Sequence, residues 1–158
     1  MHAAALAVIL VYLLYRCIKW LVEIPARRRR EALMRTISFS GVDAMTGREF
    51  EEYVLQVLEH RGYTCKLTPA SGDMGVDIVA VNGSSNLAVQ CKRQTRQVSR
   101  RAVADVHTGK AHYGCEGAAV VTNSWFTPSA CRLARETGTS LVDRETLAAW
   151  IEHFQVKG

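Results

Sequence analysis

The order of apolar segments after residue 43 most constrains the fold of this chain of 158 residues. A helix is expected from Thr46 to about Gly62, because Thr46 and Glu49 form a capping-box pattern and apolar residues then recur at helical spacing. Three short β-type runs follow, and helices and strands then alternate to the end of the chain. The order αβββαβαβα predicts an α/β domain with a mixed β-sheet flanked by helices on both faces.

The first 24 residues are apolar and require a separate explanation. Residues 3–15 carry no charge, and Arg16 and Lys19 follow at a position where long side chains reach lipid headgroups. A bilayer core needs ~20 apolar residues, so we expect one transmembrane helix over residues 3–20. A secretory signal peptide and a soluble amphipathic helix are the alternatives. The former lacks a positive n-region and a cleavage site, and the latter lacks polar residues.

A run of arginines, Arg27–Arg30, follows the apolar segment. Because positive charge marks the cytoplasmic side, we expect a single-pass protein of the inner (cytoplasmic) membrane with its C-terminal domain in the cytoplasm. The same run is also suited to contact nucleic acid. The expected organisation is a transmembrane anchor over 1–24, a basic linker over 25–42 and one folded domain over 43–158.

The five cysteines are dispersed and form neither C-x-x-C pairs nor a zinc pattern with histidines. An odd number of scattered thiols is typical of small buried side chains in a reducing compartment. This agrees with a cytoplasmic location for the folded domain.

Four polar residues on three of the expected elements suggest a common site. In a strand over residues 87–93, Gln90 and Lys92 point to one face, opposite to the apolar positions. Burying two such side chains without partners would be costly. Asp77 lies in the preceding strand of the expected hairpin, so pairing brings its carboxylate close to them. Glu51, at the rim of the apolar stripe of the first helix, faces along the sheet.

These residue types suit hydrolysis of a phosphodiester. Oxygen ligands from Asp77, the amide of Gln90 and a backbone carbonyl would hold Mg²⁺ or Mn²⁺, and the cation would polarise the phosphate and activate water. Lys92 would orient that water and offset phosphate charge. Glu51 would hold a water or help to bind a second metal. In isolation, however, an aspartate after a glycine is usually a turn residue, and a lone strand lysine is usually solvated.

Six short motifs in order strengthen the combination, because the chain resembles the Mrr-type restriction endonuclease domain of the PD-(D/E)XK nuclease superfamily. The motifs are Gly47-Arg-Glu-Phe-Glu51, Gly62-Tyr63, Gly72-Asp-Met-Gly-Val-Asp77, Val89-Gln-Cys-Lys-Arg93, Val121-Thr-Asn-Ser and Phe126-Thr-Pro-Ser-Ala130.

The resemblance implies a restriction-endonuclease-like fold with an αβββαβ core, and cleavage of double-stranded DNA with Mg²⁺. It places Glu51, Asp77, Gln90 and Lys92 in the catalytic site, with Glu51, Asp77 and Gln90 as metal ligands. Glutamine replaces the acidic residue of the wider superfamily, as is usual in the Mrr branch. Asp73 matches the glycine loop, and we expect it to be structural.

A basic segment follows the predicted catalytic strand. Residues 92–112 contain six Lys or Arg side chains and one Asp. We expect Arg93, Arg96, Arg100 and Arg101 to contact DNA phosphates together with the N-terminus of the next helix. The alternative for each arginine is a solvated helix face. No further recognition element is evident, so contacts should be salt-dependent and largely independent of sequence.

The sequence therefore predicts a membrane-tethered, Mg²⁺-dependent endodeoxyribonuclease that acts in restriction and defence or in DNA processing. One alternative is a catalytically silent DNA-binding module of the same fold. Another is a Holliday-junction-resolving nuclease, which would require a homodimer. The presence of all four catalytic residue types favours the enzyme over the silent module.

Overall fold

The computed structural model describes residues 9–20, 38–69, 72–83 and 85–156. The chain divides into two compact units, Met1–Thr36 and Ile37–Gly158. In the first unit, residues 9–20 are helical. Residues 3–8 of the expected membrane span lie outside the described residues, as do 21–37 of the expected anchor and linker. Within the described ranges, no helix combines the length and the apolar character that a membrane crossing requires.

The second unit contains five strands and five helices among its described residues. The strands are β1 (Thr64–Leu67), β2 (Ile78–Asn82), β3 (Ser85–Lys92), β4 (Gly117–Thr122) and β5 (Ser140–Val142). The helices are α2 (Phe39–Ala44), α3 (Gly47–His60), α4 (Arg100–Gly109), α5 (Pro128–Thr137) and α6 (Arg144–Val156).

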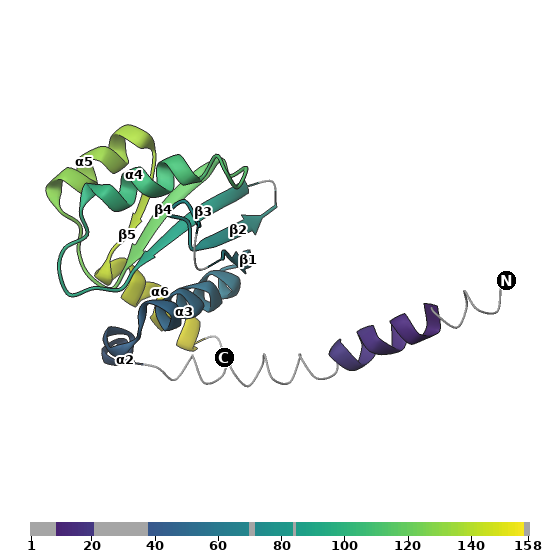
Figure 1. The fold of residues 1–158 in the computed structure, drawn as a ribbon. Coiled ribbons are helices and arrows are strands. Elements are labelled where there is room, and N and C mark those ends of the chain that lie inside the picture. The colour runs from purple at the N-terminus through teal and green to yellow at the C-terminus, as the bar shows by residue number, and fades with distance from the viewer. Residues whose placement is uncertain (1–8, 21–37, 70–71, 84, 157–158) are drawn as a thin grey trace. The chain divides into compact units, whose positions relative to one another are not determined.

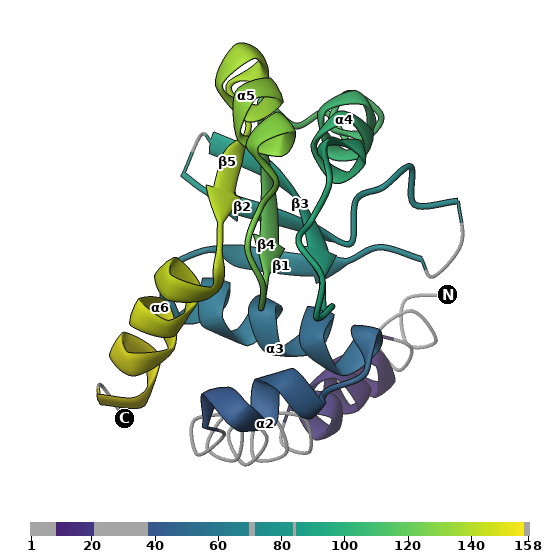
Figure 2. The ribbon, with the colours of Figure 1, turned by 90° about the vertical axis from the view of Figure 1, so that its left-hand side faces the viewer.

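The five strands form one mixed sheet in the order β1-β2-β3-β4-β5. The first three are antiparallel, whereas β4 and β5 run parallel to β3. Helices α4 and α5 cover one face, and α3 and α6 cover the other (Figures 1 and 2). This architecture confirms the predicted mixed α/β sheet flanked by helices, and it brings the carboxyl ends of β3 and β4 to the same edge.

The core of the α4–α5 face is made of small and β-branched side chains. Ala88 of β3 and Val120 of β4 pack there against Val103 and Val106 of α4, all buried. Because strand side chains alternate, Gln90 and Lys92 share this face with Ala88. Strand β3 is therefore apolar where α4 covers it and polar near its carboxyl end.

Local sequence signals set several element boundaries as predicted. Thr46 caps α3 in a capping box with Glu49, and the helix ends at His60 before Gly62 at φ 93°. Two boundaries differ from expectation. Strand β2 begins at Ile78, so Asp77 precedes it instead of lying within it. The spacing of Val103 and Val106 predicts a helix over about residues 99–112, but α4 ends at Gly109 because successive turns follow from residue 110.

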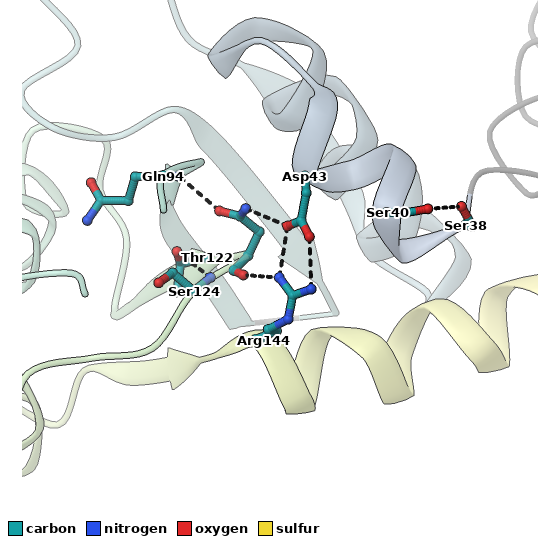
Figure 3. A network of polar contacts seen from close by, with 8 residues as sticks. Ser38, Ser40, Asp43, Gln94, Thr122, Ser124 and Arg144 are labelled. Atoms are coloured by element: carbon teal, nitrogen blue, oxygen red, sulfur yellow. Dashed lines mark hydrogen bonds and ion pairs between the residues drawn. The ribbon is translucent and has the colours of Figure 1, made fainter. Parts of the chain in front are cut away.

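The expected linker over 25–42 contains part of a helix that the sequence did not predict. Helix α2 buries Val42 completely. Its Asp43 forms a bidentate ion pair with Arg144 of α6, with both N···O distances at 2.8 Å. Asn123 donates to the same carboxylate and accepts from the backbone N–H of Gln94 (Figure 3). The folded domain consequently begins before residue 43, the boundary expected from composition.

Candidate active site

The glycine loop that precedes β2 is folded back on itself and packed against α4. The carboxylate of Asp73 accepts from the N–H of Gly75 at 3.1 Å, and its carbonyl accepts from the N–H of Val76 at 2.9 Å. A Cβ at Gly75 would lie 2.7 Å from the Cβ of Asp105 on α4. Glycine is therefore required at position 75, both for its positive φ of 75° and for this close approach.

Hydrogen bonds on both sides hold Asp77 in place. Its backbone N–H donates to Val89 at 2.8 Å, and its carbonyl accepts from the N–H of Thr68 at 3.0 Å. The side-chain Oδ2 accepts from the N–H of Cys91 at 2.6 Å. Burial raises the pKa of Asp77. Cys91 and Lys92 oppose that shift, while the negative charges of Glu51 and Asp73 add to it. The carboxylate is thus positioned rigidly in surroundings that would favour a cation.

Gln90 and Lys92 extend from the same face of β3, as predicted. Gln90 is only 3% exposed, and its Oε1 has no hydrogen-bond partner in the described part of the chain. A buried carbonyl oxygen without a partner costs about 1–3 kcal/mol, which a ligand at this position would offset. Lys92 is half-buried.

Asp77, Gln90 and Lys92 line one cleft of about 530 Å³, together with residues of the glycine loop and α4. Glu51 lines a smaller adjacent cleft of about 150 Å³, which Asp73 and Asp77 also line. Its carboxylate lies 3.0 Å from Nη1 of Arg48, and its side chain is 22% exposed. Three of the four predicted catalytic residues therefore share one cleft, and Asp77 joins it to the cleft that contains Glu51.

The oxygen atoms that the predicted ligands offer are of the types that a hard divalent cation binds. Within the ranges that the structure describes, no three His, Cys, Asp or Glu side chains gather closely enough to hold a metal. The predicted ligands differ from such a group because they include the amide oxygen of Gln90, which has no partner among the described residues. A carboxylate, an amide oxygen and backbone carbonyls are ligands that Mg²⁺ and Mn²⁺ accept.

Three further residues of the cleft were not expected to belong to the site. Asp73, which we interpreted as a loop residue, makes loop hydrogen bonds and also lines both clefts. Met74 and Asp105 line the larger cleft. Asp105 comes from α4, and its position depends on how closely that helix approaches the glycine loop. No pattern in the sequence indicates that approach except the glycines at 75 and 109.

The four predicted DNA-contacting arginines are placed differently from one another. Arg96, Arg100 and Arg101 are exposed, and Arg101 lines a third cleft of about 320 Å³ that also contains Lys92. Its guanidinium lies 3.8 Å from the carboxylate of Asp105. Arg93 is half-buried, and its Nε is buried without a hydrogen-bond partner among the described residues.

Most of the second unit matches a known protein family. Residues 42–151 match the family model of the Mrr catalytic domain, described as restriction endonuclease. A comparison with curated proteins found no match.

Solved structures with a similar fold include a protein of unknown function, AF1548, with 18% identity and a TM-score of 0.52 over 59% of this chain and 55% of that one. The MspJI restriction endonuclease in complex with a 27-mer oligonucleotide is 27% identical, with a TM-score of 0.46 over 64% of this chain and 26% of its own. The DNA modification-dependent restriction endonuclease AspBHI is 14% identical, with a TM-score of 0.42 over 68% and 40%. The chain therefore spans about half or less of the length of these proteins.

Proposed function

Because the chain belongs to the restriction endonuclease family defined by the Mrr catalytic domain, we propose that it is a metal-dependent endodeoxyribonuclease that cleaves double-stranded DNA. One observation carries the proposal. The buried Oε1 of Gln90 lacks a partner among the described residues, and Gln90 lines a cleft together with Asp77 and Lys92. An amide oxygen, a carboxylate and a cationic side chain are the groups that a metal-assisted phosphodiester hydrolysis needs.

Asp77 and Gln90 would hold Mg²⁺ or Mn²⁺, and Glu51 would contribute from the adjacent cleft. The cation, when bound, supplies Lewis-acid polarisation of the phosphate. Lys92 offsets the negative charge that develops on the phosphate and orients the attacking water. The Cys91 N–H fixes the carboxylate of Asp77 through one oxygen, so that the other oxygen remains available to a cation.

Cleavage of supercoiled plasmid by the full-length protein tests this function. We expect nicking and linearisation with Mg²⁺ or Mn²⁺, none in EDTA, and activity reduced at least 100-fold in Asp77→Ala and Lys92→Ala. Lys66→Ala is the matched control, because Lys66 is an exposed lysine on β1. If wild-type protein leaves the plasmid intact but binds it in a salt-dependent manner, the chain is a DNA-binding module and the nuclease proposal fails.

The basic surface beside the active site would hold the DNA backbone. Arg96 and Arg100 are exposed, and Arg101 and Lys92 line the third cleft. Since the Nε of Arg93 is buried, we assign the phosphate contacts to the three exposed arginines. Removing one arginine that neutralises a phosphate should reduce the slope of log K against log salt concentration by about 0.9.

Binding isotherms at several salt concentrations measure this slope. The triple alanine variant of Arg96, Arg100 and Arg101 should bind more weakly and with a shallower slope than wild-type protein. The control replaces Arg132 and Arg135, two arginines of α5, and should leave the slope unchanged. Equal slopes in all three proteins would place the DNA elsewhere.

Membrane attachment through residues 3–20 is a separate part of the proposal. The helical residues 9–20 expose large apolar side chains, at Ile9, Leu10, Val11, Tyr12, Leu13, Leu14, Tyr15, Ile18 and Trp20. A continuous apolar surface of this kind suits contact with lipid. Full-length protein should sediment with the cytoplasmic membrane, and a variant lacking residues 1–24 should not. Full-length protein in the soluble fraction would contradict attachment.

A further inference from the structure

Met74 adopts a conformation that costs free energy, at the edge of the proposed active site. It is the one non-glycine residue in the described ranges with a positive φ, at 52°. It is also 55% exposed, although its side chain is large and apolar. Residues other than Gly, Asn and Asp rarely adopt a backbone conformation with positive φ. Both the backbone conformation and the exposure of Met74 are therefore unfavourable.

The surrounding structure fixes this conformation. Asp73 closes the loop through its hydrogen bonds to the backbone of Gly75 and Val76. On the other side, a Cβ at Gly109 of α4 would lie 2.2 Å from the carbonyl oxygen of Met74. Because α4 packs directly against the Met74 backbone, the loop cannot relax to a negative φ without moving away from the helix.

Met74 lies beside the proposed catalytic residues, where its side chain could contact bound DNA. Met74 lines the cleft that contains Asp77, Gln90 and Lys92. A thioether makes no useful contact with a phosphate, so an exposed methionine here is suited to the apolar part of DNA, the stacked bases. Unbranched apolar side chains are among those that insert between base steps and kink the duplex.

We propose that Met74 is a specificity-determining residue that inserts its side chain between adjacent base pairs near the scissile phosphate. The proposal rests on the nuclease function and adds a source of selectivity to it. Pyrimidine–purine steps are unstacked more easily than other steps. An inserting side chain therefore makes cleavage depend on the local flexibility of the DNA, without any hydrogen bond to a base edge.

Mapping of nick positions by sequencing tests the role of Met74. Wild-type protein, Met74→Gly and Met74→Leu would each nick the same plasmid under conditions of one nick per molecule. We expect wild-type nicks to cluster at a fixed distance from pyrimidine–purine steps. Met74→Gly should cleave roughly tenfold less at those steps and approach a uniform map. Met74→Leu retains an apolar side chain and should retain the preference.

Met74→Gly should remain folded, because glycine readily adopts a positive φ. Thermal unfolding of each variant checks that its stability matches that of wild-type protein. A uniform map for wild-type protein, or identical maps for wild type and Met74→Gly, would overturn the role of Met74 while leaving the nuclease intact. Uncut plasmid with wild-type protein would instead remove the nuclease function itself, and the role of Met74 with it.

Discussion

At the scale of single residues, the buried carboxylate of Asp77 affects the stability of the fold in a pH-dependent way. Burial raises its pKa above the ordinary value of 3.8. With respect to this group, the native state therefore binds a proton more tightly than the unfolded chain does. Its stabilising contribution is present at low pH and is lost as the pH rises through the raised pKa. The ionised form of the buried Asp77 carboxylate therefore lowers the stability of the fold.

Asp77→Asn should separate stability from activity. The uncharged amide still accepts from the N–H of Cys91, so we expect Tm at pH 7 to rise by roughly 3 °C, the shift that about 1 kcal/mol gives in a domain of this size. The gain should shrink as the pH falls through the raised pKa of Asp77 towards the ordinary value of 3.8. Plasmid cleavage should be abolished. Asp143→Asn, at a position that caps Thr146, is the control. A lower Tm for Asp77→Asn would contradict this reasoning.

Gln90 allows a second residue-scale prediction, because its buried amide stands where a carboxylate would bind a cation more tightly. Gln90→Glu adds a charge next to Asp77 in a position that is 3% exposed. In EDTA, the free energy of unfolding of the variant should fall by roughly 2–4 kcal/mol, and Mg²⁺ should restore part of it.

Urea unfolding with and without Mg²⁺ measures both effects in Gln90→Glu. Gln97→Glu, at an exposed glutamine, should be neutral in either condition. Stability of Gln90→Glu that does not respond to Mg²⁺ or Mn²⁺ would argue against a metal ligand at position 90.

At the scale of elements, a substitution that adds one methyl group to α4 tests how closely this helix packs on the glycine loop. In Gly109→Ala, the new Cβ would lie 2.2 Å from the carbonyl oxygen of Met74 and 2.9 Å from Cγ2 of Val76. Relief requires α4 and the loop to separate, so we expect the free energy of unfolding in urea to fall by about 2–3 kcal/mol, accompanied by weaker cleavage.

Gly47→Ala provides the matched control for this change. It also lies in a helix, and its Cβ would meet nothing within 4 Å. Because alanine is the better helix former, this variant should be unchanged or stabilised by up to about 1 kcal/mol. Equal effects of the two substitutions would mean that helix propensity, and not the packing of α4 on the loop, determines the result.

Elements with strong local signals were predictable from the sequence, and those that depend on distant contacts were not. The capping box at Thr46 and the apolar run Gly117–Thr122 located α3 and β4. Helix α2 was missed because its six residues include Ser40 and Gly41 and are too few for helical periodicity. Its contacts include an ion pair to a residue 101 positions away, which no local pattern in the sequence indicates.

The same distinction applies to the site. Alternation along one strand placed Gln90 and Lys92 on a common face, and hairpin pairing brought Asp77 to them. Asp105 reaches the cleft only because α4 crosses beside the loop, which is a tertiary contact without a local signal. Glu51 was expected in the same site, and the structure places it in the adjacent cleft that shares Asp77.

At the scale of the whole domain, the ion pair between Asp43 and Arg144 links the first helix, α2, to the last helix, α6. Arg144 also donates to the carbonyl of Asn123 (Figure 3). Its Cζ lies 4.3 Å from the centroid of the Phe39 ring of α2. Through Asn123, the network reaches the backbone of Gln94, just beyond β3. The first helix of the domain is thus tied to the segment that follows β3.

A double-mutant cycle of Asp43→Ala and Arg144→Ala measures the strength of this tie. Both side chains are about one-third exposed, which weakens the charge interaction, but the bidentate geometry strengthens it. We expect a coupling free energy of about 1 kcal/mol in urea unfolding. The control cycle uses Arg101 and Asp105, which lie 3.8 Å apart with side chains 88% and 44% exposed, and should give coupling near zero. If the two cycles agree, solvent screening cancels the Asp43–Arg144 interaction. Helix α2 would then be held to the domain by the burial of Val42, the hydrogen bond from Asn123 and the contact of Phe39 with Arg144.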